Sequence, residues 1–246
     1  MNWAASREIT LVVGQSGSGK TTFALRYLVN CQAAVRFVWD ADGQLSDRLG
    51  LPAAETLEEC ALSLASGWVV FQPRRHAAEE FPRVFDAWAR WVWETSGRLR
   101  GRKVLLVDEV WRYCTPSTIP GGLSECVLTG RVRELDCLFC TQHPNKLHGT
   151  LTGETTEAVS FCLTQDLNLR PMISLGHDPE ELRRLVKGEW VSRAGMLIAR
   201  GSLFGRVRPL HGQAGPRVKP STVDTKQGRG RQEPAALPGV EGNNTQ

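Results

Sequence analysis

A glycine-rich octapeptide near the amino end has the residue types and spacing with the clearest chemistry. It reads Gly14-Gln15-Ser16-Gly17-Ser18-Gly19-Lys20-Thr21 and is followed by Thr22. The pattern G-x-x-x-x-G-K-[ST] is typical of a phosphate-binding loop, because its glycines let successive backbone N–H groups point at phosphate oxygens. Lys20 would neutralise phosphate charge, and the Thr21 hydroxyl would bind Mg²⁺. An apolar run precedes the loop and a helical pattern follows it, which argues against a glycine-rich turn without a ligand.

Two acidic residues follow a second apolar run, Lys103-Val-Leu-Leu-Val. A strand buried on both faces would carry Asp108 to its carboxyl end beside the phosphate loop, where it would hold Mg²⁺ through the water shell. Glu109 would then orient the attacking water or accept its proton. The alternative is that one of the two acids only caps a helix. An acid in the second position favours a nucleoside triphosphate hydrolase, with ATP as the expected nucleotide.

A third apolar run, Leu138-Phe-Cys-Thr-Gln142, ends in a polar amide. Gln142 is placed to hydrogen-bond the γ-phosphate or the attacking water. Arg131 and Arg133 lie upstream, near the end of a predicted helix, and either is a candidate arginine finger for the active site of an adjacent subunit. The alternative for each arginine is an ordinary solvated side chain.

Strand-like and helix-like patterns alternate through residues 1–204, which indicates a largely parallel sheet covered by helices on both faces. The predicted strands are residues 9–13, 35–39, 68–71, 104–107, 137–141 and 158–164. The predicted helices are residues 20–30, 57–65, 77–95, 123–134 and 179–187, and a terminal hairpin is expected around Val191 and residues 196–199. Aromatic residues at three- and four-residue spacing along 77–95 predict a core-facing stripe rather than a base-stacking surface.

The motifs and this organisation predict an α/β fold of the RecA/ASCE-like P-loop NTPase class, with a mostly parallel central sheet, a C-terminal hairpin and a disordered tail. The length of 246 residues and the 41% hydrophobic content suit one domain with an appendage. No stretch reaches the roughly 18 apolar residues of a membrane span. The seven cysteines form no spaced framework, so we expect reduced thiols in a soluble, intracellular protein. Cys137 and Cys140 would point to opposite faces of a strand.

The formal net charge of +4 is concentrated at the carboxyl end. Residues 205–246 hold seven Lys or Arg against three acids, together with seven Gly and five Pro. Such a composition cannot bury enough apolar surface to offset its ordering entropy. We therefore expect an ATPase domain over 1–204 and a basic, flexible tail over 205–246. The tail is either an arm attracted to an anionic surface such as nucleic acid or a solubilising appendage.

The three motifs together resemble those of the FtsK–HerA superfamily of DNA-pumping ATPases. In that family an arginine-bearing helix precedes a strand ending in Ala-Thr-Gln-x-Pro, and this sequence has Cys140-Thr-Gln-His-Pro144 with Arg131 upstream. The resemblance spans roughly residues 8–200, including a trailing Gly-Glu-Trp segment, and is greatest to the genome-packaging ATPases of internal-membrane phages and viruses. Two departures are the cysteine before Thr141 and the thinner run of arginines.

The resemblance implies a homo-oligomeric ring, with a hexamer as the expected state, in which ATP and Mg²⁺ are bound between subunits and double-stranded DNA lies in the centre. It also implies capsid or membrane vertex proteins as docking partners, and a location in the host cytoplasm or with the virion. Candidate DNA contacts are two basic runs, 98–103 and 74–76, and the loop 145–155. Each of these runs is also consistent with a solvated surface. Asn145-Lys146-Leu147-His148 lacks the acid that would bind guanine, which argues against GTP.

Three other functions stay open on the sequence. One is a cytoplasmic ATPase for filamentous phage assembly or plasmid transfer, although such proteins commonly carry a membrane helix. Another is a nucleotide or small-molecule kinase, which would need an arginine-rich lid and an acceptor pocket. The last is an ATP-binding switch that regulates assembly without moving DNA. Stimulation of ATP hydrolysis by long double-stranded DNA, and by no small acceptor, would separate a translocase from a kinase.

Overall fold

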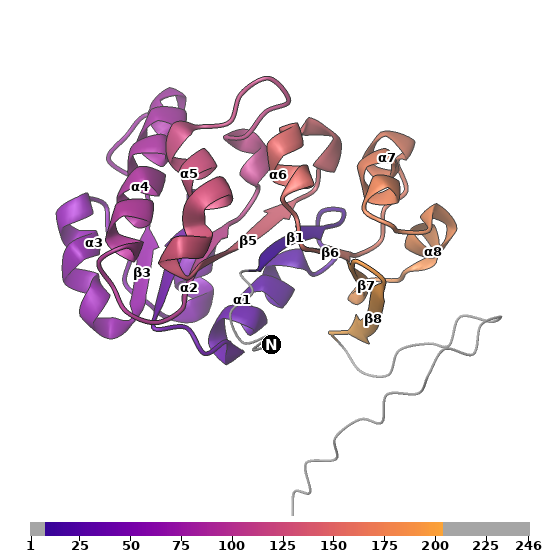
Figure 1. Ribbon diagram of the computed structural model, residues 1–246, viewed down its shortest axis with the longest axis horizontal. Helices are drawn as coiled ribbons and strands as arrows, with labels where there is room; N and C mark the ends of the chain where they lie inside the picture. The colour runs from indigo at the N-terminus through magenta and orange to yellow at the C-terminus, as the bar shows by residue number, and fades with distance from the viewer. Residues whose placement is uncertain (1–7, 204–246) are drawn as a thin grey trace, which may run out of the picture. The chain divides into compact units, whose positions relative to one another are not determined.

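One eight-stranded sheet organises the protein in the computed structural model, which describes residues 8–203. The strand order is β3-β2-β4-β5-β1-β6-β7-β8 (Figure 1). The strands are β1 (Ile9–Val13), β2 (Val35–Trp39), β3 (Trp68–Phe71), β4 (Lys103–Val107), β5 (Leu135–Thr141), β6 (Glu157–Ser160), β7 (Glu189–Ala194) and β8 (Leu197–Ser202). Strands β1 to β6 pair in parallel, and β7 and β8 add an antiparallel hairpin.

Every residue of β1, β4 and β5 is buried. Their continuous apolar character follows from their position, because a central parallel strand is covered on both faces. Strand β5 lies between β1 and β4 and pairs with both. The carboxyl ends of these three strands therefore meet at one edge of the sheet, where each of the three sequence motifs begins.

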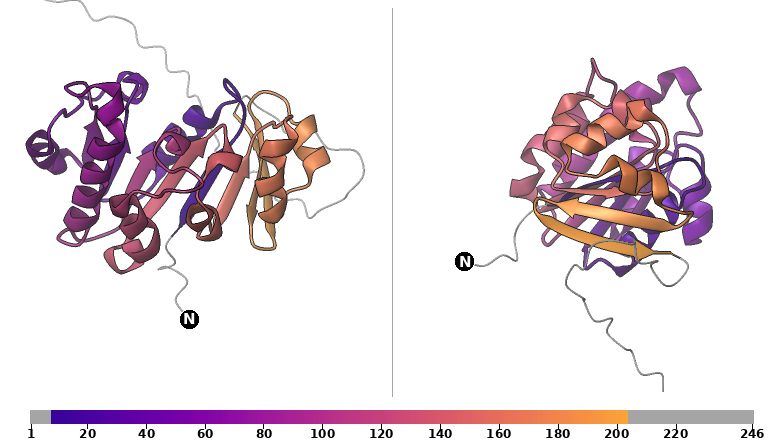
Figure 2. Two further views of the ribbon diagram at one scale, coloured as in Figure 1. Left: turned by 90° about the horizontal axis from the view of Figure 1, so that it is seen from above. Right: turned by 90° about the vertical axis from the view of Figure 1, so that its right-hand side faces the viewer.

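Two layers of helices enclose the sheet (Figures 1 and 2). The helices are α1 (Lys20–Asn30), α2 (Gln44–Leu49), α3 (Leu57–Ser63), α4 (Phe81–Ser96), α5 (Gly121–Thr129), α6 (Gly149–Gly153), α7 (Asp166–Ser174) and α8 (Pro179–Arg184). One core cluster joins the sheet to α4, α5, α6 and α7, and a second joins it to α1 and α2. Cys137 belongs to the first cluster and Cys140 to the second, so the two side chains lie on opposite faces as expected.

The aromatic stripe of α4 is core packing, as the sequence predicted. Phe85 and Trp88 are fully buried. The Trp39 ring from β2 lies 5.0 Å from the Phe85 ring and 5.4 Å from the Trp88 ring, measured between centroids. Aromatic pairs at this spacing add to the free energy of simple burial. This cluster fixes the end of β2 relative to α4.

Several boundaries differ from the sequence prediction. Strand β6 ends at Ser160, earlier than the predicted residue 164, because its parallel partner β1 leaves the sheet after Val13 to form the glycine-rich loop. The helix predicted over 123–134 is α5 followed by a separate 3₁₀ turn, η5 (Gly130–Arg133). The helix predicted over 179–187 ends at Arg184. Helices α2, α6 and α7 were not predicted, and the segment 145–155, expected to be a loop, contains α6 (Gly149–Gly153).

The fold class is confirmed as an α/β arrangement with a mostly parallel sheet, helices on both faces and a C-terminal hairpin. The predicted flexible tail over 205–246 lies outside the described residues. Within residues 8–203, none of the helices combines the length and apolar character that a membrane span requires.

Candidate active site

The glycine-rich loop connects β1 to α1 at the carboxyl edge of the sheet. Gly17 and Gly19 have φ values of 72° and 119°, which side chains with a Cβ adopt only with strain. A Cβ on Gly14 would lie 2.6 Å from the Phe161 Cβ, so only glycine fits there. Gln15, Ser16 and Gly17 are exposed. The exposed middle of the loop therefore lies at the start of a helix, where an anion is favoured.

The structure brings Lys20, Thr21, Asp108 and Glu109 together beside this loop. The Lys20 Nζ atom lies 3.8 Å from Oε1 of Glu109 and donates a hydrogen bond of 3.1 Å to the Gln15 carbonyl. The Thr21 hydroxyl donates to Oδ2 of Asp108 at 3.1 Å. The predicted phosphate-binding and acidic motifs thus meet in space, although they are far apart in the sequence.

Burial raises the pKa of Asp108 above its ordinary value, and the neighbouring Glu109 charge adds to the rise. The Thr21 hydroxyl, the Glu109 backbone N–H and the Lys20 ammonium act in the opposite direction. Such competition marks a carboxylate held in a desolvated, charged environment. A hydroxyl and a carboxylate at this spacing are the oxygen ligands that Mg²⁺ prefers, so the residues present fit that ion.

Glu109 is held by the chain around it. Its backbone is in the left-handed region, with φ 47°, a conformation that costs a non-glycine residue about 1 kcal/mol or more. The Glu109 backbone N–H donates to Oδ1 of Asp108 at 2.9 Å. Its Oε2 atom accepts from the Trp111 indole N–H at 2.8 Å and from the Gln142 backbone N–H at 3.3 Å. Gln142 therefore contacts Glu109 through its backbone N–H, and the role expected of its side-chain amide stays a prediction.

A third acid, Asp40, lies at the carboxyl end of β2, next to β4. It is buried and accepts from the backbone N–H groups of Leu45 and Ser46, at 3.1 and 2.8 Å, and from the Gln72 amide at 3.0 Å. A small cavity of about 30 Å³ connects this region to Asp108. Asp40 follows an apolar run, as Asp108 does. The carboxylate of Asp40, however, already accepts hydrogen bonds from other groups of the chain.

Arg48, on α2, is a site neighbour that the sequence analysis missed. Its Nη2 atom donates to the Thr22 hydroxyl at 2.7 Å, and its side chain is exposed. This contact places a cation within the same chain beside the first turn of α1. No spacing rule links Arg48 to the glycine-rich loop, so only the fold identifies it.

The two candidate arginine fingers lie at the other edge of the sheet from the phosphate loop of their own chain. Both precede β5, whose seven residues extend about 20 Å at roughly 3.3 Å per residue. Arg131 is exposed in η5. Arg133 donates to the Trp93 carbonyl at 3.0 Å, and its guanidinium carbon lies 3.4 Å from the centre of the Trp93 ring. The structure therefore brings neither arginine to the site formed by Lys20 and Glu109.

The basic runs considered as DNA contacts are partly engaged within the chain. Arg102 pairs with Asp136 and with Glu8, and Lys103 is buried with its Nζ atom donating to the Leu99 carbonyl at 3.1 Å. Arg75 forms ion pairs with acids of the segment before and within α3. All basic members of these runs except the buried Lys103 are exposed: Arg74, Arg75, His76, Arg98, Arg100 and Arg102.

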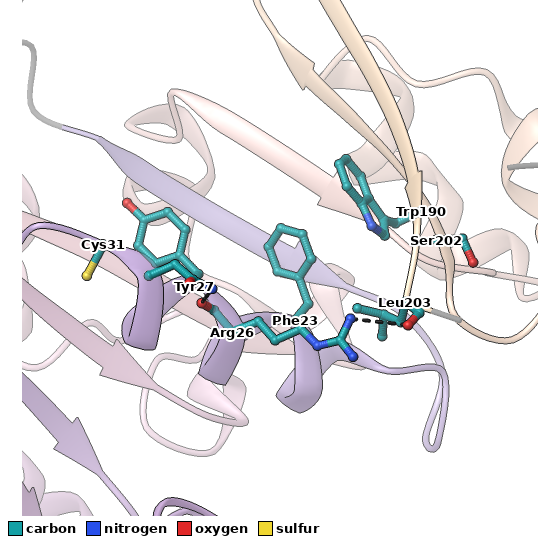
Figure 3. A pocket seen from close by; sticks show the side chains of 8 residues that line it. Phe23, Arg26, Tyr27, Cys31, Trp190, Ser202 and Leu203 are labelled. Atoms are coloured by element: carbon teal, nitrogen blue, oxygen red, sulfur yellow. Dashed lines mark hydrogen bonds between the residues drawn. The ribbon is translucent and has the colours of Figure 1, made fainter. Parts of the chain in front are cut away.

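A larger cavity of about 460 Å³ lies between α1 and the β7–β8 hairpin (Figure 3). Phe23 and Trp190 meet in its wall with ring centroids 5.3 Å apart. Arg26 donates to the Leu203 carbonyl at 3.1 Å. A Cβ on Gly19 would lie 2.5 Å from Cδ1 of Leu203, so the wall of this cavity also packs against the phosphate loop. No pattern in the sequence indicated this cavity.

No family model matches the sequence, and no curated protein does. Solved structures do match the fold. The genome packaging NTPase B204 from Sulfolobus turreted icosahedral virus 2, in its complex with sulfate, is 15% identical, with a TM-score of 0.65 over 79% of this chain and 95% of that chain. The same protein in complex with ATP-γS gives 15% identity and a TM-score of 0.63 over 78% and 96%.

VirB4 of Thermoanaerobacter pseudethanolicus is 12% identical, with a TM-score of 0.59 over 82% of this chain and 90% of that chain. At these identities the likeness concerns the fold, and it extends over nearly the whole of each compared protein. It agrees with the family that the motifs resemble. The chain therefore shares its fold with the B204 and VirB4 structures.

Proposed function

We propose that this protein is an ATP-hydrolysing DNA translocase, of the kind that packages a viral or phage genome. The observation that supports it best is the constellation of Lys20, Thr21, Asp108 and Glu109, whose side chains meet at 3.1 and 3.8 Å beside a loop of exposed backbone. A phosphate-binding lysine beside two carboxylates supports the hydrolysis of a nucleoside triphosphate. Sharing a fold with the genome packaging NTPase B204 adds support for the choice of process.

Each residue of the site has a role in this proposal. The backbone of residues 14–19, with Lys20, Thr21 and Thr22, binds the phosphates of ATP. Thr21 and Asp108 hold Mg²⁺, which supplies neutralisation of phosphate charge when bound. Glu109 orients the attacking water and accepts its proton. Gln142 stands at the end of β5, between the phosphate loop and Glu109, where it responds to the state of the nucleotide.

The arginine required for the transition state comes, in this proposal, from a second copy of the chain. Arg131 is exposed at the amino edge of the sheet, and the phosphate loop lies at the carboxyl edge. A head-to-tail ring joins unlike edges of neighbouring subunits, so it would bring Arg131 of one copy to the nucleotide of the next. Arg133 is the second candidate, although its contacts with Trp93 and α4 already engage it. We infer a ring, with six subunits as the expected number, around double-stranded DNA.

The test is to measure the ATP hydrolysis rate and the oligomer mass with and without long double-stranded DNA. We expect DNA to raise the rate and to favour a closed ring. If DNA does not change the rate of ATP hydrolysis, the protein is better explained as an ATP-driven switch. If a small phosphate acceptor raises the rate, the protein is a kinase. Lys20→Ala provides the negative control, because no other cation of the loop replaces its contact with the phosphates.

A further inference from the structure

Trp111 joins the candidate catalytic carboxylate to the segment that follows β5. It lies in the 3₁₀ turn η4 (Val110–Arg112), directly after Glu109, and is half-buried. Its indole N–H donates to Oε2 of Glu109 at 2.8 Å. The same oxygen accepts the Gln142 backbone N–H at 3.3 Å. One carboxylate oxygen is therefore fixed by two donors, while Oε1 faces Lys20.

The ring of Trp111 makes two further contacts. The His143 ring meets it edge to face, with centroids 4.9 Å apart and planes at 87°. The Lys146 ammonium lies 4.6 Å from the ring centre, within the range of a cation–π contact. His143 follows Gln142 directly, and Lys146 ends the next turn, η6 (Pro144–Lys146). Both donors to Oε2 of Glu109 are thus connected to the segment 142–146, one through the backbone and one through side-chain packing.

We propose that Trp111 is a positioning residue for ATP hydrolysis, which holds Glu109 through its N–H group and transmits the position of segment 142–146 to that carboxylate through its ring. The inference rests on the hydrolytic role of Glu109 proposed above. Phosphate oxygens at the loop compete for Lys20 when ATP binds. Oε1 of Glu109 then loses its cation while Oε2 keeps its two donors, so the free lone pairs of Oε1 turn to the attacking water.

Lys146 gives this arrangement a link to a polyanion. Its side chain is exposed, and its ammonium is the part of the segment that a DNA phosphate would contact. A phosphate that draws Lys146 from the ring changes the packing of Trp111 and, through segment 142–146, the second donor to Glu109. The turnover number kcat, rather than the KM for ATP, is the quantity that such a contact changes.

The first test compares steady-state ATP hydrolysis by the full-length wild type and Trp111→Phe. Phenylalanine keeps an aromatic ring against His143 and Lys146 but removes the N–H donor. We expect kcat to fall roughly 10- to 100-fold, the usual effect of a misplaced catalytic group, while KM for ATP and the melting temperature stay near wild-type values. Trp93→Phe is the matched control, because the Trp93 indole also donates a 2.8 Å hydrogen bond, to Thr129. Equal kcat in Trp111→Phe and Trp93→Phe overturns the proposal.

The second test places Trp111→Phe in a Glu109→Gln background. If Trp111 acts through Glu109, adding Trp111→Phe to Glu109→Gln lowers kcat no further. If the kcat of the double variant falls by the product of the two single effects, the proposal is wrong. If Glu109→Gln hydrolyses ATP slowly while Trp111→Phe has the wild-type kcat, the role proposed for Trp111 is wrong and the role proposed for Glu109 stands. Normal turnover by Glu109→Gln overturns the hydrolytic role of Glu109 and this inference with it.

The third test uses a surface substitution, which leaves the buried part of the site intact. Lys146→Gln should abolish most of the change in kcat that long double-stranded DNA produces in the wild type. Arg83→Gln, at an exposed position on α4, is the charge-matched control and should keep the full response. A response in Lys146→Gln equal to that in Arg83→Gln overturns the link between Lys146 and Glu109.

Discussion

The Nζ atom of Lys20 and the Oε1 atom of Glu109 lie 3.8 Å apart, with 5% and 22% of their side chains exposed. One residue begins α1 and the other follows β4, and only the parallel pairing of β1 and β4 with β5 brings them together. The ammonium group proposed to bind phosphate and the carboxylate proposed to activate water thus lie as an ion pair in one partly desolvated space.

This pairing predicts how Glu109→Gln behaves. The amide keeps the size of the side chain but cannot accept a proton, so the variant should bind ATP and hydrolyse it slowly. Loss of a general base lowers kcat by about 100-fold or more. Nucleotide binding by titration and product formation at saturating ATP give the two measurements. Turnover near the wild-type rate would remove Glu109 from the proposed mechanism.

Arg131→Ala tests the contribution of a neighbouring subunit. The variant should bind ATP almost normally and hydrolyse it roughly 10³-fold more slowly, because a finger supplied in trans acts on transition-state charge. Mixtures of Arg131→Ala and Lys20→Ala subunits should recover activity at some interfaces, since one variant keeps an intact pocket and the other keeps an intact finger. If subunits that demonstrably exchange show no recovery at any ratio, Arg133 becomes the residue to test.

Removal of residues 206–246 tests the basic segment. Its composition supplies little apolar surface, so we expect the melting temperature to change by only a few degrees. If the segment contacts DNA, its removal should also flatten the dependence of DNA affinity on salt, because each lost phosphate contact removes counterion release. If the dependence of DNA affinity on salt is unchanged, the segment does not contact DNA, and its role is to keep the protein soluble or to bind another protein.

His177 predicts an acid-sensitive component of stability. Its side chain is 3% exposed, and burial lowers its pKa to about 4. Because the unfolded chain binds the proton more tightly, this residue favours the fold fully above pH about 6.5 and loses that contribution as the pH falls toward 4. The loss is on the order of 3 kcal/mol. Urea unfolding of His177→Gln at several pH values should show a shallower decline than the wild type over that interval.

Glutamine at position 177 retains an N–H group for the Ala158 carbonyl, which lies 3.1 Å from Nε2 of His177. Comparing the wild type with His177→Gln therefore separates the effect of protonating the imidazole from the effect of losing its hydrogen bond. Parallel pH profiles for the two proteins would show that another group causes the acid sensitivity.

The sequence predicted those parts of the fold whose signals are local. Buried strands such as β1, β2 and β3 have apolar runs with polar or glycine boundaries, and their observed bounds equal the predicted ones. Helix α7 was missed because Pro171 lies inside it, and proline usually ends a helix. Helix α2 has only six, mostly polar residues, so it shows no helical periodicity. The end of β6 was missed because it depends on where β1 leaves the sheet.

The same division applies to the site. The phosphate loop and the acids after β4 have fixed spacings, and the structure places them together. Trp111 and Arg48 have no such spacing, since their roles depend on a hydrogen bond to Glu109 and one to Thr22. An arginine or a tryptophan outside any motif has many possible surroundings in a folded protein. Only tertiary contacts distinguish these two from the others.

The central position of β1 has a consequence for biosynthesis. It is the first strand of the sheet to leave the ribosome, yet its neighbours are β5 and β6. Until β5 has been translated, both edges of this apolar strand are unpaired, and one edge stays unpaired until Ser160 has been translated, a state that favours aggregation. The glycine-rich loop packs against Phe161 and Leu203, so it lacks part of its support until Leu203 has been translated. A stalled or truncated nascent chain is consequently a substrate for chaperones and proteases before it can be a nucleotide-binding protein.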